Sequence, residues 1–134
     1  MDRHLSAAVL VVADDLMWST RITEAIRRTG APVVNLKTAD ELSIALEADI
    51  EGEAPTIRGA VVDLNGRRYD GVAAIKLVAS GRLPVIAVAQ HDDQVTRKRA
   101  LEAGASRVFS YQKFFSDGAQ LVGRWLAAGA AQDT

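Results

Sequence analysis

Five short runs rich in apolar residues recur along the chain, and each ends in polar or turn-forming residues. The runs at 8–13 and 60–62 show no alternation of polar and apolar positions, which is typical of strands buried on both faces. The runs at 83–89 and 107–110 predict two further strands. The run at 32–36 predicts a shorter edge strand, because it opens with proline.

Between these runs, apolar residues recur at helical spacing. Thr38 and Glu41 form a capping-box pattern, and Asp92 or Asp93 is expected to cap a later helix. The predicted helices span residues 16–29, 39–50, 70–81, 93–104 and 116–128. We predict a single domain over residues 1–134, with a core at about 7–128 and a frayed tail at 129–134.

The alternation of strands and helices predicts an α/β fold. Short strands that alternate with helices form parallel sheets, and right-handed crossovers place helices on both faces. We therefore expect a flavodoxin-like, doubly wound sheet of five parallel strands in the order 2-1-3-4-5. In that order the first and third strands are neighbours, and a crevice lies beyond their carboxyl ends.

Acidic residues follow both of these neighbouring strands. Asp14 and Asp15 end the first strand, and Asp63 ends the third. Like charges this close need a raised pKa or a cation, and Mg²⁺ with its oxygen ligands is the usual partner. The remaining carboxylate would then be free to act as a nucleophile and form an aspartyl-phosphate. The alternative is that these acids only cap the adjacent helix and loop.

Composition narrows the class of protein. The chain has 134 residues, a net charge of −1 and no cysteine. The charge argues against a general nucleic-acid binder, and the absence of cysteine excludes disulfides and thiolate metal sites. We find no apolar run long enough for a membrane span and no signal-peptide pattern, so we expect a cytoplasmic protein with no membrane partner.

The motifs together resemble the response-regulator receiver domain, a CheY-like family, over residues 7–128. The matching segments are Val-Val-Ala-Asp14-Asp15, Val-Val-Asp63-Leu-Asn, Asp70-Gly71, Leu83-Pro84-Val-Ile and Ala103-Gly104-Ala105. The resemblance implies that Asp63 is the phosphoacceptor and that Asp14 and Asp15 bind the metal. It also implies that the backbone carbonyl of Asn65 completes the Mg²⁺ shell.

The chain departs from the family at the switch positions. Ala89 stands where the family has Thr or Ser, and Tyr111 stands where it has Lys. Val108 occupies the position of the inward-swinging aromatic residue, unless a one-residue shift places Phe109 there. Lys113 lies two residues too late to replace the missing Lys without a rebuilt loop. Because Ala89 and Tyr111 are expected to supply neither the hydroxyl nor the cation that reads a phosphate, the resemblance is to an atypical or pseudo-receiver.

Three functional hypotheses follow. The first is a stand-alone, non-enzymatic receiver-like module of two-component signalling that acts by protein–protein contact and keeps the acid pocket with degenerate switch residues. The second is a working response regulator that a histidine kinase phosphorylates on Asp63. The third is a small flavodoxin-like enzyme or nucleotide binder that uses the pocket with Mg²⁺, although no phosphate-binding loop accompanies the acids. With no output domain after Thr134, we expect the partner, a kinase or a downstream regulator, to act in trans.

The surface formed by the fourth helix, the fifth strand and the fifth helix is where many receivers dimerise or meet partners. Five of the seven aromatic residues fall late in the chain: Phe109, Tyr111, Phe114, Phe115 and Trp125. Some of them must be core, and those that are exposed are candidate anchors for such a contact. The alternative is that they only cover the bottom of the fifth helix. The Asp-Asp pair of dimerising relatives is replaced by Ser106-Arg107. We therefore predict apolar contact, with a partner or in a homodimer, more than salt bridges.

Overall fold

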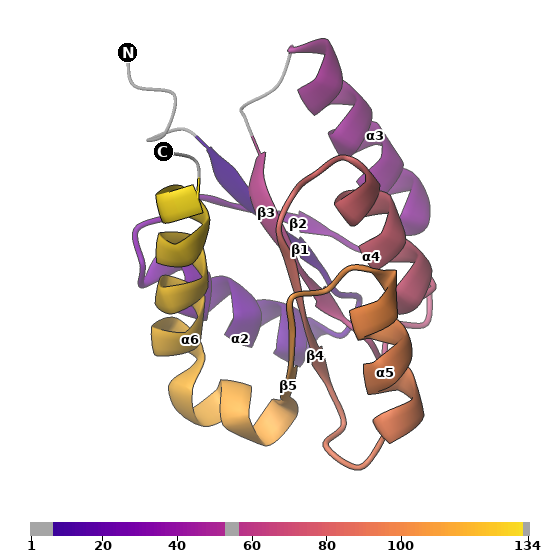
Figure 1. Ribbon diagram of the computed structural model, residues 1–134, viewed down its shortest axis with the longest axis vertical. Helices are drawn as coiled ribbons and strands as arrows, with labels where there is room; N and C mark the ends of the chain where they lie inside the picture. The colour runs from indigo at the N-terminus through magenta and orange to yellow at the C-terminus, as the bar shows by residue number, and fades with distance from the viewer. Residues whose placement is uncertain (1–6, 53–56, 133–134) are drawn as a thin grey trace.

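The computed structural model describes residues 7–52 and 57–132, which form one five-stranded parallel sheet with helices on both faces (Figure 1). The strand order is β2-β1-β3-β4-β5, as predicted. The strands are β1 (Ala8–Val12), β2 (Val33–Leu36), β3 (Ile57–Asp63), β4 (Val85–Ala89) and β5 (Arg107–Ser110). The helices are α2 (Leu16–Arg27), α3 (Ala39–Glu51), α4 (Gly71–Ser80), α5 (Gln94–Ala103) and α6 (Tyr111–Gln132).

The central strands are buried along their whole length. All residues of β1 and β4 are buried, and β3 shows one half-buried position in an otherwise buried strand. The edge strand β2 is mostly exposed, which agrees with its opening proline. Pro32 lies just outside β2, where its carbonyl accepts a hydrogen bond from the Val9 N–H at 2.9 Å. The ring therefore removes no donor from the ladder.

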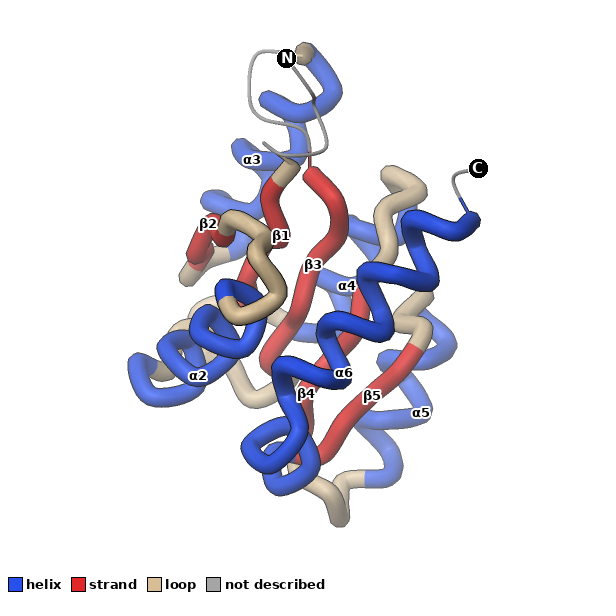
Figure 2. The backbone as a smooth tube through the Cα atoms, turned by 90° about the vertical axis from the view of Figure 1, so that its left-hand side faces the viewer, coloured by secondary structure: helices blue, strands red, loops and turns tan. Residues whose placement is uncertain are grey.

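Two hydrophobic clusters fill the space on either side of the sheet. One lies beneath α3, α4 and α5 and includes Leu42, Ile75 and Ala100. The other lies beneath α2 and α6 and includes Ile22 and Val122. Figure 2 shows α2 and α6 running together across their face of the sheet. This two-sided packing explains why the central strands need apolar residues at successive positions.

Polar caps begin the helices where the sequence predicted them. Thr38 Oγ1 accepts the Glu41 N–H at 3.1 Å, and Glu41 Oε1 accepts the Lys37 N–H at 3.0 Å. Asp93, one of the two candidates, caps α5 by accepting the Thr96 N–H at 3.0 Å. These contacts satisfy N–H groups that have no partner within the helix.

The last helix differs from its prediction at both ends. α6 begins at Tyr111, directly after β5, and continues through Gln132 with a kink at Asp117. Asp117 has non-helical backbone angles, so the helical segment after it begins beside the predicted start at Ser116, and the segment before it was not predicted. The frayed tail predicted from 129 is helical as far as Gln132; residues 133–134 lie outside the described part. Ser110 Oγ accepts the Lys113 N–H at 3.1 Å and so caps a first turn that the apolar pattern did not reveal. Among the described residues, no helix is both long enough and apolar enough to cross a membrane.

Candidate functional site

An open pocket of about 490 Å³ lies at the carboxyl ends of the central strands. Loops after β1, β3 and β4 and the start of α6 surround it. Its lining residues are Asp14, Asp15, Trp18, Asp63, Asn65, Arg67, Gln90 and Tyr111. The fold thus brings together four residues that the sequence analysis selected as the acid site, and Tyr111 with them.

Asp63 is the buried centre of this pocket, with only 1% of its surface exposed. Its Oδ1 accepts the Asn65 N–H at 3.1 Å and also the hydroxyl hydrogen of Tyr111. Burial raises the pKa of the Asp63 carboxyl; the two hydrogen bonds oppose that rise, and the negative charges of Asp15 and Asp14 add to it. Among the described residues, no hydrogen bond reaches Oδ2.

The two acids after β1 make different contacts. Asp14 Oδ2 accepts the backbone N–H groups of Arg67 and Arg68, each at 2.7 Å, and thereby ties the β3–α4 loop to the end of β1. Asp15 Oδ1 accepts the Trp18 N–H at 2.9 Å and caps α2. Asp15 therefore does cap the adjacent helix, as the alternative interpretation of the acids predicted. Each acid keeps a second oxygen that no described residue binds.

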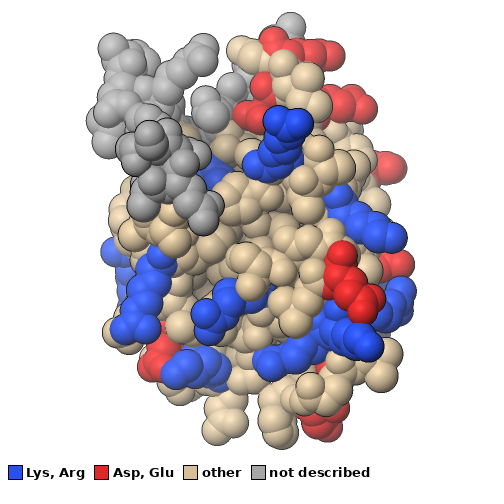
Figure 3. Space-filling model, viewed as in Figure 1, with Lys and Arg blue, Asp and Glu red and all other residues tan. Residues whose placement is uncertain are grey.

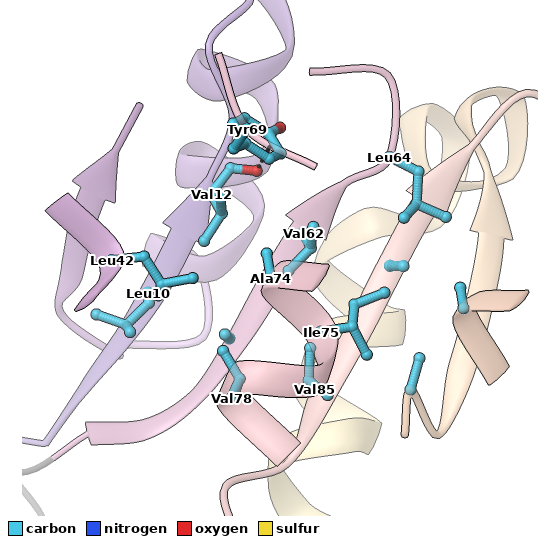
Figure 4. Packing of buried hydrophobic residues seen from close by; sticks show 14 of the residues in the cluster. Leu10, Val12, Leu42, Val62, Leu64, Tyr69, Ala74, Ile75, Val78 and Val85 are labelled. Carbon is cyan, nitrogen blue, oxygen red and sulfur yellow. Dashed lines mark hydrogen bonds between the residues drawn. The ribbon is translucent and has the colours of Figure 1, made fainter. Parts of the chain in front are cut away.

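Tyr69 lies behind the pocket and was not selected from the sequence. Its ring is buried, and its hydroxyl lies 3.0 Å from the carbonyl oxygen of Val12 and 2.6 Å from that of Asp63 (Figure 4). One hydroxyl proton serves the ends of both β1 and β3. At Gly66 a Cβ would overlap this ring, so the glycine is required by close approach. Gly66 was the only sequence signal of this packing.

Tyr111 stands over Asp63 and is held by aromatic contacts. Its ring centroid lies 4.3 Å from that of Trp18, with a tilt of 36°. The Arg21 guanidinium lies 5.8 Å from the Trp18 ring and 4.2 Å from the Phe115 ring. Tyr111 thus brings a phenol hydroxyl into contact with Asp63, which the sequence analysis did not predict.

The other switch positions, Ala89 and Val108, do not line the pocket. Ala89 and Val108 are buried in the cluster beneath α3, α4 and α5, whereas Phe109 belongs to the opposite cluster. The residue after Ala89, Gln90, lines the pocket instead. Lys113 forms an exposed ion pair with Asp117 at 2.8 Å, so it does not replace the missing Lys in this arrangement.

The donor atoms of the pocket suit a hard, partly hydrated cation. Asp14, Asp15 and Asp63 all belong to its lining. The described residues nevertheless include no group of three or more His, Cys, Asp or Glu side chains gathered closely enough to hold a metal ion. Since Mg²⁺ commonly uses one or two carboxylates and completes its shell with water, the residues fit that ion without enclosing it.

Comparison with known proteins identifies the fold. No protein-family model matches the chain, and no curated protein matches it. The chain is similar to a response regulator in red-light signalling of R. palustris, with 20% identity, a TM-score of 0.71, and coverage of 88% of this chain and 90% of that chain. It is also similar to a response regulator receiver domain from Rhodospirillum rubrum, with 23% identity, a TM-score of 0.70, and coverage of 89% and 93%.

A third solved structure is the Mn²⁺-bound form of a response regulator, with 16% identity, a TM-score of 0.69, and coverage of 90% and 94%. The strand order and these matches show that the chain has the response-regulator receiver fold. The predicted resemblance is therefore confirmed at the level of fold.

Proposed function

We propose that this chain is a receiver-like signalling module of the two-component type, which works by contact with a protein partner in trans rather than as an enzyme. The observation that carries the proposal is the pocket where Asp14, Asp15 and Asp63 meet at the carboxyl edge of a receiver-type sheet. The proposal places the protein in the cytoplasm, where a histidine kinase or a downstream regulator would meet it.

In this proposal Asp63 is the phosphoacceptor of the pocket. Asp14, Asp15, Asp63 and the carbonyl of Asn65 would hold Mg²⁺. When bound, the ion would offset negative charge on the acids and on phosphoryl oxygens. The Mn²⁺-bound state of one structural neighbour supports this choice of ion. The charge of Asp63 would be kept by its hydrogen bond from the Asn65 N–H.

The switch residues favour a module with weakened phosphotransfer over a fully working response regulator. Ala89 offers no hydroxyl, and Tyr111 offers a neutral donor where the family has a cation. A phosphoryl group on Asp63 would therefore lack the ion pair that favours the active conformation. The working response regulator remains the second candidate, because the oxygen Oδ2 of Asp63 has no hydrogen bond from the described residues and Asp63 lines an open pocket.

Mg²⁺ binding is the first prediction. Titration with MgCl₂ is expected to give a saturable change in tryptophan fluorescence, because Trp18 lines the pocket. Asp63→Asn should weaken the response by removing one charged ligand, and Trp18→Phe should abolish it, which assigns the signal away from Trp125. A flat titration in the wild type, by fluorescence and by amide NMR shifts, would contradict the acid-site proposal.

The structure excludes two of the five candidate aromatic anchors, which lie in the core. Phe109 and Phe114 are buried, Tyr111 and Trp125 are half-buried, and only Phe115 is exposed, at 62%. Trp125 instead packs on the sheet, where a Cβ at Gly59 would lie 2.9 Å from its ring. Since Phe115 lies beside Arg21 of α2, it does not anchor the α5–β5–α6 face either.

The face formed by α5, β5 and α6 remains the proposed contact with a partner or a second copy. We now propose that charged side chains contribute to this contact more than aromatic ones do. Its exposed side chains include Lys98, Arg99 and Arg107, together with Val95 and Leu101 of α5. Figure 3 shows Lys and Arg side chains spread over the lower part of this view, with acidic side chains beside some of them. An acidic partner surface would complement it.

The second prediction concerns this contact. The association of this face with an acidic partner or with a second copy, measured by sedimentation or pull-down, is expected to weaken as NaCl rises from 50 to 500 mM. Exposed charges are screened over roughly 10 Å at 0.1 M salt. Arg107→Glu should weaken the association further. Lys76→Glu, at an exposed position of α4 outside this face, is the matched charge reversal and should not. Association that persists at high salt and ignores Arg107→Glu would favour the apolar contact predicted from the sequence.

A further inference from the structure

The hydroxyl of Tyr111 occupies the same carboxylate oxygen of Asp63 that the Asn65 N–H contacts. Both donors converge on Oδ1. Hydrogen bonds to an ionised carboxylate are stronger than neutral ones, and a carboxylate whose lone pairs are engaged is a weaker nucleophile. The phenol O–H of Tyr111 is the donor in this contact, and the carboxylate is the acceptor.

The Tyr111 ring is held in place by its backbone at the start of α6 and by its contact with Trp18. Tyr111 is the first residue of α6, and Ser110 caps that turn. Trp18 of α2 packs against the ring at 4.3 Å, and Arg21 contacts both Trp18 and Phe115. A side chain fixed by stacking loses little further freedom when it forms its hydrogen bond, so the closed arrangement is favoured over a swung-out one.

A ligand at Asp63 must compete with this arrangement. A tetrahedral phosphoryl group, or a beryllofluoride group in its place, brings three electronegative atoms next to the carboxylate. Trp18 and Tyr111 border the same space. With a cation at position 111, such a group would gain an ion pair. With the closed phenol, a group attached at Oδ2 takes the negative charge off Asp63 and weakens the hydrogen bond that Tyr111 donates to Oδ1.

We propose that Tyr111 is a built-in competitor for Asp63: its hydrogen bond stabilises the unliganded carboxylate and so lowers the affinity of Asp63 for phosphoryl groups and their mimics until the ring moves away. The inference rests on the proposed function of the acid pocket and adds its regulation. Tyr111 acts here as a positioning residue: it sets the fraction of molecules in which Asp63 is open.

The test is the affinity of the folded protein for beryllofluoride in the presence of Mg²⁺, followed by ¹⁹F and amide NMR. Tyr111→Phe keeps the ring and its stacking on Trp18 but removes the hydroxyl. We expect it to bind beryllofluoride about tenfold more tightly or better, the range set by loss of one hydrogen bond to a charged group. Trp18→Leu, which loosens the ring and keeps its hydroxyl, should gain by a smaller factor.

Tyr69→Phe is the matched control, because it removes a buried tyrosine hydroxyl that contacts backbone carbonyls rather than a carboxylate. It should gain no affinity. Equal or weaker binding by Tyr111→Phe would overturn the inference, because the hydroxyl would then have no effect on the ligand or would bind it. The proposed function of the acid pocket would be unaffected. If neither the wild type nor a folded Tyr111→Phe binds beryllofluoride, the phosphoacceptor role of Asp63 and this inference both fail.

Discussion

Tyr69→Ala is expected to lower the free energy of unfolding by about 3 to 5 kcal/mol, the range found when a buried aromatic side chain is truncated. Tyr69 is 8% exposed and belongs to the cluster beneath α3, α4 and α5. The variant would leave a cavity behind the acid pocket. It would also remove the hydroxyl that contacts the carbonyl oxygens of Val12 and Asp63.

Urea unfolding at pH 7, monitored by circular dichroism, measures this loss. Tyr69→Phe should cost only about 1 kcal/mol, because it keeps the ring and removes a single hydrogen bond. Ile44→Ala, at a position of α3 that is 65% exposed, should stay within about 0.5 kcal/mol of the wild type. A loss below about 1 kcal/mol for Tyr69→Ala would show that the tyrosine does not join the two strand ends as described.

The same contacts relate stability to the site. Asp14 is hydrogen-bonded to the loop that follows β3, and Tyr69 lies beneath that loop at Gly66. The loop between Asp63 and α4 is therefore fixed by the Asp14 carboxylate and by the ring of Tyr69. Preorganisation of this kind places the Asn65 N–H on Asp63 before any ligand arrives.

Short-range pattern was sufficient to predict the sheet. Apolar residues at successive positions of β1 and β3 require cover on both faces, and this requirement predicts a parallel sheet with alternating helices. Given that order, the meeting of Asp14 and Asp63 followed from chain direction alone, because parallel strands end at one edge. The prediction needed no knowledge of any side-chain conformation.

The contacts made by aromatic residues could not be predicted in this way. The sequence analysis took Phe109 and Phe114 as candidate surface anchors. Both are buried, because Phe109 points to the α2–α6 side of the sheet and Phe114 lies in the unpredicted first segment of α6. Whether Tyr111 faces solvent or Asp63 depends on where α6 begins. That start is set by the Ser110 side chain, a single local hydrogen bond that carries no periodic signal.

Asp63→Asn is expected to make the protein more stable than the wild type at neutral pH and to lose that advantage in acid. Burial raises the pKa of Asp63 in the folded state above its ordinary value of 3.8. Between 3.8 and the raised pKa the folded protein binds more protons than the unfolded chain, so wild-type stability falls as pH rises through this window. Above the window the wild type carries the full cost of a buried charge.

Asparagine avoids this cost at every pH, and its side-chain oxygen still accepts the hydrogen bonds that Asn65 and Tyr111 donate. Urea unfolding at a series of pH values from 3 to 8 should therefore show a stability difference between variant and wild type that is absent at the acid end and grows with pH to a plateau. Asp40→Asn, on the exposed first turn of α3, should stay within about 0.5 kcal/mol of the wild type. A difference that is constant with pH, or that favours the wild type at pH 7, would mean that the burial of Asp63 is offset by its hydrogen bonds, and the carboxylate would then be held ready for a ligand at no cost to the fold.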